Sequence, residues 1–391
     1  MYVSKRVAAA LADASWIRRL FEEGERMRRD GGGPVYDFSL GNPEIDPPDA
    51  LVETLLKEAS DTTPSNYRYM PNTGFEAARK AVAESMSEDH GLPFDARNIL
   101  MTVGAAGAVN TALRAVLDPG DEVVVTAPYF VEYRFYIQNH GGKMVVVPST
   151  PTFEIDPAAI DAAITPKTRV VIMNNPNNPT GVVYAQETLD ALGEVLRGAS
   201  SRIGRPIYLL DDAPYRKLVY DMDRCPSAFG AYEDTFMATS HSKDLAIPGE
   251  RIGFLAISPR SPGAAELANA AAFTNRILGY VNAPALMQRV ITHLQSVTID
   301  MAWYRRKRDR LVSKLSECGY DMATPRGAFY LFVKAPGGDD VAFVNRLKAS
   351  RVLVVPGIGF GTPGYFRIAY CVSDETIEGA LPVFEQVMTT R

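Results

Sequence analysis

Residues 99–126, ILMTVGAAGAVNTALRAVLDPGDEVVVT, decide the fold. The apolar run at 99–103 predicts a strand, 106–117 predicts a helix, 118–121 (Asp-Pro-Gly-Asp) predicts a turn, and 122–126 predicts a second strand. Strands that alternate with helices specify parallel strands joined by right-handed crossovers. The chain is therefore expected to have an α/β fold around a mostly parallel sheet, with ligands at the carboxyl ends of its strands.

The residues that follow three of the expected strands are polar or glycine-rich. Gly104-Ala105-Ala106-Gly107 opens a helix, whose free amides and dipole favour an anion. It lacks the Gly-x-Gly-x-x-Gly pattern of dinucleotide binding. The run at 170–173 leads into the proline-braced loop 174–181, which can hold a side chain rigidly for hydrogen bonding. The run at 207–210 ends in Asp211 and Asp212, and a buried carboxylate is costly unless a cation faces it.

A lysine follows the next expected strand. The apolar run at 235–238 leads into Ser240-His241-Ser242-Lys243, and another strand resumes at 252–256. A lysine held between two core strands loses hydration, so it deprotonates more easily and can attack a carbonyl. The alternative is a lysine that points to water, as most lysines do. The hydroxyls of Ser240 and Ser242, with Arg251 eight residues after the lysine, suit a phosphate-bearing aldehyde.

The stretch from Ser240 to Arg251 resembles the lysine motif of class I/II aminotransferases, which are pyridoxal phosphate (PLP) enzymes of fold type I. The resemblance implies that Lys243 forms a Schiff base with PLP and acts as general base. It also implies that Arg251 and the amides of Ala105 and Ala106 bind the cofactor phosphate. Some relatives have threonine or lysine at the position of Ala106, so a side-chain contact from there is absent.

Further motifs of the same family occur in the same order. The signature Asn-Pro-x-Asn-Pro-Thr-Gly at 175–181 implies that Asn178 contacts the cofactor ring oxygen and the substrate carboxylate. The pattern Asp-x-x-Tyr implies that Asp212 keeps the pyridine nitrogen protonated and that Tyr215 bonds the ring oxygen. Asp211 does not fit that spacing and is interpreted as a solvated or capping acid. Phe130, two residues after Pro128, either stacks on the ring or is a core phenylalanine.

Substrate and partner contacts are assigned by the same resemblance. Gly41, in Gly41-Asn42-Pro43, either lies against the substrate or forms a plain turn. Arg367, inside an apolar strand, suits the substrate α-carboxylate, with an internal salt bridge as the alternative. Tyr69 is implied to reach the cofactor phosphate of a neighbouring subunit, and Tyr67 is its competitor. Arg276 either binds a distal carboxylate or is a surface arginine.

The bulk properties limit the possible partners. A net charge of −5 argues against nucleic acid or an anionic membrane as partner. The N-terminal 29 residues lack the apolar region of a signal peptide, and no run reaches the roughly 18 apolar residues of a membrane helix. Three widely spaced cysteines, 225, 318 and 371, fit no metal pattern and suggest reduced thiols. We therefore expect a cytoplasmic protein without a metal.

The resemblance, from about Gly41 to Arg367, implies a homodimer with active sites at the subunit interface. Residues 1–40 would form an N-terminal arm and part of a small domain, 41–290 a large PLP-binding domain with a seven-stranded sheet, and 291–391 the rest of a small α+β domain. The implied activity moves the α-amino group of an L-amino acid to a 2-oxo acid. A carbon–sulfur β-lyase and a non-catalytic PLP-binding regulator are the alternatives. Acidic, alanine, aromatic, methionine and branched substrates stay open.

Overall fold

The fold is described from a computed structural model, which covers residues 2–12 and 16–389. In this part of the chain seven strands form one large sheet, in the order β2-β8-β7-β6-β5-β3-β4. Only β8 runs antiparallel to its neighbours. The expected α/β class and mostly parallel seven-stranded sheet are confirmed. The strands are β2 (Ile99–Thr102), β3 (Glu122–Ala127), β4 (Lys143–Pro148), β5 (Thr168–Asn174), β6 (Tyr208–Asp212), β7 (Thr235–Ser240) and β8 (Gly253–Ile257).

The elements of residues 99–127 agree with their predicted boundaries to within two residues, and the largest difference lies at the start of the helix. The helix expected from residue 106 begins at Gly104, directly after β2. Gly104 has a φ of +80°, a left-handed conformation that glycine adopts without penalty, so the chain turns from strand into helix at once. The helix thereby places its first amides at the carboxyl end of β2.

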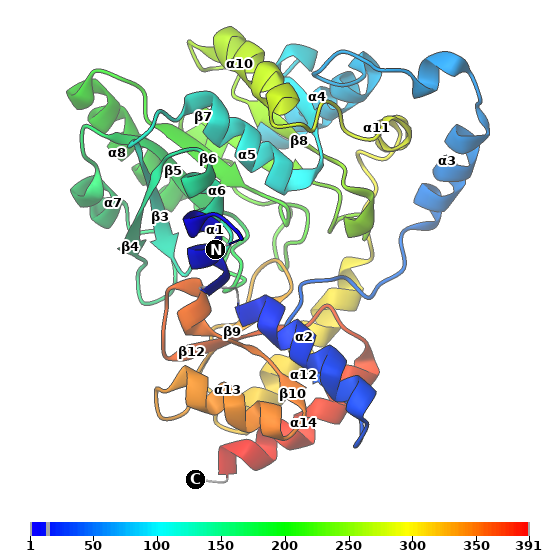
Figure 1. Ribbon diagram of the computed structural model, residues 1–391, viewed down its shortest axis with the longest axis vertical. Helices are drawn as coiled ribbons and strands as arrows, with labels where there is room; N and C mark the ends of the chain where they lie inside the picture. The colour runs from blue at the N-terminus through cyan, green and yellow to red at the C-terminus, as the bar shows by residue number, and fades with distance from the viewer. Residues whose placement is uncertain (1, 13–15, 390–391) are drawn as a thin grey trace.

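Helices cover both faces of the large sheet, because alternate strand residues are apolar on each face (Figure 1). On one face, α5, α6 and α10 pack on residues such as Ile172, Leu210 and Phe236. On the other, α4, α7, α8, α9 and α11 pack on residues such as Val171, Leu209 and Met237, and α3 packs on α11. The helices are α3 (Asp49–Ser60), α4 (Glu76–His90), α5 (Gly104–Val116), α6 (Tyr133–Asn139), α7 (Pro157–Ala163), α8 (Gln186–Ile203), α9 (Ala228–Ala231), α10 (Ala264–Ile277) and α11 (Ala285–Thr292).

The two ends of the chain pack together below the large sheet in Figure 1. Strand β1 pairs in parallel with β10, and a three-stranded antiparallel sheet has the order β11-β12-β9. Leu20 of α2 is buried against Phe332, Val355 and Phe360. The elements are α1 (Lys5–Ala12), α2 (Trp16–Asp30), β1 (Tyr36–Asp37), α12 (Met301–Glu317), β9 (Tyr330–Lys334), α13 (Asp340–Ala349), β10 (Val352–Leu353), β11 (Val355–Pro356), β12 (Tyr365–Ala369) and α14 (Asp374–Thr389).

Two helices expected from the sequence are present with shifted ends. Trp16, Leu20 and Met27, on one side of a helix, predict an amphipathic helix at 13–29. It corresponds to α2, which runs to Asp30, and residues 13–15 lie outside the described part. The strongly charged stretch 298–318 predicts another helix. It corresponds to α12, which begins at Met301 because the Asp300 carboxylate accepts a hydrogen bond from the Ala302 amide and caps it. Short 3₁₀ turns complete the chain: η1 (Pro64–Tyr67), η2 (Ala96–Asn98), η3 (Pro248–Glu250) and η4 (Gly357–Phe360). Across residues 2–12 and 16–389, no helix has the length and apolar character needed to cross a membrane.

Candidate active site

A cavity of about 270 Å³ opens at the carboxyl end of the large sheet, where it meets residues of β9 and β12. Its walls come from the loops after β2, β5, β6 and β7, as expected for a ligand site in an open parallel sheet. The structure brings twelve of the candidate residues together around it. They are Gly41, Ala105, Ala106, Phe130, Asn178, Asp212, Tyr215, Ser240, Ser242, Lys243, Arg251 and Arg367.

Lys243 is held in the turn between β7 and β8. Its Nζ donates a hydrogen bond to the backbone oxygen of Gly41 at 2.7 Å and lies 5.6 Å from the centre of the Phe329 ring. Burial, together with the positive charges of Arg251 and Arg367, lowers the pKa of Lys243 to about 8. The neutral, nucleophilic amine is therefore accessible near neutral pH.

Asp212 lies at the end of β6 with its carboxylate in the cavity wall. The Tyr133 hydroxyl of α6 donates to Oδ2 at 2.6 Å, whereas Oδ1 has no hydrogen-bond partner among the described residues. Burial raises the pKa of Asp212 to about 6, although the Tyr133 hydrogen bond opposes the shift. An orphaned, buried carboxylate oxygen that faces a cavity requires a donor from the molecule that fills it.

The first turn of α5 and Arg251 form an anion-binding end of the cavity. No side chain of the described part of the chain caps α5, so the amides of its first turn are available to a ligand. Arg251 donates to the backbone oxygens of Pro248 at 2.9 Å and Val103 at 3.3 Å, which fixes its guanidinium beside the start of α5. The two features together suit a phosphate group.

Arg367 is buried on β12 at the opposite end of the cavity. Its Nη1 donates to Asn178 Oδ1 at 3.0 Å, its Nη2 donates to the Ser39 backbone oxygen, and its Nε has no partner among the described residues. The ring centres of Tyr330 and Phe360 lie 4.8 and 4.9 Å from its guanidinium. In the described chain Arg367 makes no salt bridge, so its charge is available to an anionic ligand.

Three tyrosines and an asparagine in or behind the cavity wall were missed by sequence reasoning. Tyr133 bonds Asp212, Tyr330 bonds Tyr215 at 2.8 Å, and Tyr136 lines the cavity. Asn174 accepts from the Asn178 amide at 2.6 Å and donates to the Asp212 backbone oxygen at 2.6 Å, so it ties two strand ends together. The position of Tyr133 in the helix just after Phe130 was an available signal, but no pattern in the sequence linked Tyr330 to Tyr215.

The remaining candidates lie elsewhere in the chain. Tyr69 is 91% exposed and does not line this cavity. Tyr67 is also exposed, and its hydroxyl donates to the Asp61 backbone oxygen at 3.2 Å. Arg276 is exposed on α10, where its guanidinium lies 5.4 Å from the centre of the Phe273 ring.

The interpretation of Asp211 as a solvated or capping acid was wrong. Asp211 is only 2% exposed, and its Oδ1 has no partner in the described part of the chain. It follows Leu210 on a strand that is buried on both faces, so its side chain points to the face opposite Asp212 rather than to solvent.

Comparison with known proteins gives one consistent answer. A sequence model of the family described as aminotransferase class I and II matches residues 34–384. The aspartate/prephenate aminotransferase of Thermus thermophilus is 32% identical over 371 residues, which is 93% of each chain. The aromatic-amino-acid aminotransferase 2 of Thermococcus litoralis is 31% identical over 392 residues, with 97% of this chain and 96% of the relative covered.

Solved structures agree in fold. A crystal structure of an aminotransferase from Eubacterium rectale has a TM-score of 0.94 at 40% identity and covers 99% of this chain and 98% of its own. Aspartate aminotransferase from Thermus thermophilus with maleate has a TM-score of 0.88 at 29% identity, with 99% and 100% covered.

The fold and the cavity thus define an enzyme of amino-group transfer. The chain belongs to the class I and II aminotransferases, a family that uses PLP, with an amino acid and a 2-oxo acid as substrates. The expected family and the expected aminotransferase activity are confirmed, and the comparisons lend no support to a carbon–sulfur β-lyase.

Proposed function

We propose that PLP occupies the cavity of about 270 Å³ and that Lys243 holds it covalently. The orphaned Oδ1 of Asp212 carries this proposal, because a protonated pyridine nitrogen supplies the donor that the buried oxygen needs. The start of α5, at Ala105 and Ala106, would take the phosphate with Arg251, Ser240 and Ser242. The residues present therefore fit the cofactor.

The roles of the surrounding side chains follow from their chemistry. Bound PLP supplies an electron sink for the electrons left at the substrate Cα. Asp212, once ionised, holds the proton on the ring nitrogen, and Tyr133 orients the carboxylate from behind. Lys243 Nζ, whose pKa burial lowers to about 8, would be released when the substrate amine replaces it, and it would then take the proton from Cα and donate it to the cofactor carbon bound to the amino nitrogen. Phe130 would lie against the ring face.

The substrate contacts lie on the other side of the cavity. Arg367 would take the α-carboxylate in two-point contact, and Asn178 would share it. The Gly41 backbone oxygen, which holds Lys243 Nζ, would lie against the substrate. Tyr215 would donate to the ring oxygen, with Tyr330 behind it. The names of the relatives above specify aspartate and prephenate, or aromatic amino acids. We propose aspartate or an aromatic L-amino acid as the amino donor of this chain, and a 2-oxo acid such as prephenate as the acceptor.

We also propose a homodimer in which Tyr69 reaches the cavity of the second copy. The 91% exposure of Tyr69 and its place in a surface hollow with Tyr67, Met70 and Tyr280 support this role. The pairing of β1 with β10 supports a small domain built from 1–40 and 291–391 around a large domain of 41–290. The three free cysteines support a cytoplasmic location.

A half-reaction screen tests the proposed function. Each L-amino acid is added to the PLP-loaded protein, and the cofactor absorbance and the release of the matching 2-oxo acid are followed. We expect at least one amino acid to convert the cofactor in the wild-type protein. The Lys243→Ala variant should show no multiple turnover with any of them. Lys80→Ala is the matched control, because Lys80 forms only an exposed ion pair with Glu76. Multiple turnover by the Lys243→Ala variant would contradict the proposal.

A further inference from the structure

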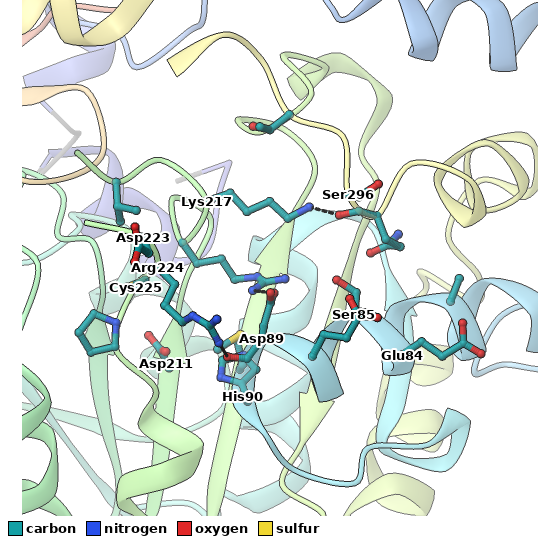
Figure 2. Close-up of a pocket in the computed structure, with 18 of the residues that line it drawn as sticks. Glu84, Ser85, Asp89, His90, Asp211, Lys217, Asp223, Arg224, Cys225 and Ser296 are labelled. Atoms are coloured by element: carbon teal, nitrogen blue, oxygen red, sulfur yellow. Dashed lines mark hydrogen bonds and ion pairs between the residues drawn. The ribbon is translucent and has the colours of Figure 1, made fainter. Parts of the chain in front are cut away.

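A second cavity, of about 590 Å³, lies on the other side of the large sheet (Figure 2). Asp211 and Met237 reach it from β6 and β7, and Asp89 and His90 reach it from the end of α4. Successive side chains of a strand point to opposite faces, so the adjacent residues Asp212 and Asp211 serve different cavities. None of the roles proposed for the active site uses this second cavity.

Three buried polar groups in its wall have no hydrogen-bond partner among the described residues. They are Asp211 Oδ1, Asn175 Nδ2 and His90 Nε2. Asp211 is 2% exposed and Asn175 is 1% exposed, so bulk water does not satisfy them freely. Buried polar groups in native proteins are almost always paired, which points to an occupant.

The charges in the wall favour a positively charged occupant. Two of the three cations are paired with carboxylates, Arg216 with Asp89 and Lys217, at 3.3 Å, with Asp244. The third, Arg224, is exposed and donates to the Asp89 backbone oxygen at 3.3 Å. The carboxylates of Asp211, Glu84, Glu88 and Asp223 form no ion pair within the described chain. Figure 2 shows Asp211 and Glu84 on opposite sides of the cavity with Asp89 between them.

The side chains in the wall of the second cavity limit the kind of cation that can bind there. Within the described residues no group of three or more His, Cys, Asp or Glu side chains is placed to hold a metal ion. An organic ammonium group, in contrast, needs only one carboxylate and fits the lone oxygen of Asp211. The unpaired Asn175 Nδ2 is a donor, so the same molecule should carry an oxygen acceptor.

We propose that this cavity binds a small primary amine with an oxygen acceptor beside its ammonium group, the ammonium on Asp211 and the oxygen on Asn175. Amino alcohols and α-amino acids share this chemistry. Burial raises the pKa of Asp211 well above its usual range, with the neighbouring Asp212 adding to the shift, and a bound ammonium would allow the carboxyl to ionise. The second cavity and the active-site cavity share no lining residue.

The methyl group of Met237 gives a readout at the cavity itself, because this residue lines it. The measurement is an NMR spectrum of PLP-loaded protein labelled with ¹³C-methyl methionine. The Met237 signal is the one that disappears in the Met237→Leu variant. We expect ethanolamine or glycine to shift this signal in a saturable manner, and ethylene glycol, which lacks the ammonium, to leave it unchanged. A response to ethanolamine alone assigns amino alcohols, and a response to glycine alone assigns α-amino acids.

Asp211→Asn keeps the shape of the side chain and removes its charge. We expect it to weaken binding about tenfold or more, whereas Glu84→Gln, at the exposed rim, should change it about threefold or less. A Met237 shift that persists in Asp211→Asn would come from amine reacting elsewhere and would overturn the proposal. The wild-type protein alone also tests the proposal, so the test does not depend on the variant folding. The proposal is wrong if neither amine shifts the Met237 signal, or if ethylene glycol shifts it equally.

Discussion

The hydroxyl oxygens of Tyr215 and Tyr330 lie 2.8 Å apart in the wall of the active-site cavity. Tyr215 follows β6 of the large sheet and Tyr330 begins β9 of the small sheet, so this contact joins the two halves of the cavity. The Tyr330 ring also lies 4.8 Å from the Arg367 guanidinium. Tyr330 therefore orients Tyr215, a proposed cofactor contact, and packs on Arg367, the proposed contact of the substrate carboxylate.

Tyr330→Phe should lower kcat/KM about threefold to tenfold, because a hydrogen bond in the cavity is worth about 0.5–1.5 kcal/mol. Tyr220→Phe is the matched control: its hydroxyl donates to the Ala328 backbone oxygen at 2.6 Å in the same core, away from the cavity. Both variants should lose similar thermal stability, and only Tyr330→Phe should lose activity. Equal kcat/KM values in the two variants would rule out a positioning role for Tyr330.

Gly41→Ala should impair the active site by overpacking. A Cβ at this position would overlap the Tyr330 hydroxyl and lie 3.3 Å from the Phe329 ring, so the backbone that holds Lys243 must move. We expect a loss of about 1–3 kcal/mol in the free energy of unfolding and a clear fall in kcat/KM. Gly198→Ala, in an exposed turn of α8 with no atom within 4 Å of the new Cβ, should gain about 0.5–1 kcal/mol. If Gly41→Ala kept the wild-type kcat/KM, the close approach of Gly41 to Tyr330 and Phe329 would not be needed for activity.

Arg367→Ala should raise KM for the amino acid about 30-fold or more, since truncating one member of a buried charged pair costs about 2–5 kcal/mol. Arg367→Lys should recover only part of the affinity, because an ammonium group cannot make the two-point contact of a guanidinium. Arg310→Ala removes an exposed ion pair with Glu378 and should leave KM unchanged. Steady-state kinetics with the best amino acid checks this, and an unchanged KM in Arg367→Ala would mean that another residue binds the carboxylate.

Asp212→Asn should separate stability from activity. The folded-state pKa of about 6 lies above the usual 3.8, so between these values the folded protein keeps a proton that the unfolded chain releases. The free energy of unfolding of cofactor-free protein should therefore fall by about 3 kcal/mol as pH rises through this window. The variant cannot ionise, so it should be more stable than wild type at pH 7 yet nearly inactive.

Urea unfolding of both cofactor-free proteins, from about pH 4 to pH 8, measures the difference directly. The two proteins should differ little in stability near pH 4, because Asp212 is protonated there in the folded protein and only partly ionised in the unfolded chain. Parallel pH profiles would show that Asp212 does not carry a raised pKa in the folded protein.

The α/β class and the residues at the strand ends could be predicted from the amino-acid sequence. Alternation of apolar runs with helices, as in 99–126, predicts parallel strands, and their carboxyl ends meet at one edge of the sheet. This rule, together with the resemblance to the motifs of class I/II aminotransferases, placed Asn178, Asp212 and Lys243 in one site although they lie far apart in the chain. Local rules also placed Gly104 at the opening of a helix.

Contacts between side chains of different elements could not be predicted in this way, because they depend on how the whole chain packs. The contacts of Tyr133 with Asp212 and of Tyr330 with Tyr215 join residues 79 and 115 positions apart, and no local pattern encodes such pairs. The burial of Asp211 was missed for the same reason: whether a strand end is covered depends on α4 and the loop around Cys225, which pack there from distant parts of the chain. Local propensities set the elements, whereas burial and side-chain pairing depend on long-range packing.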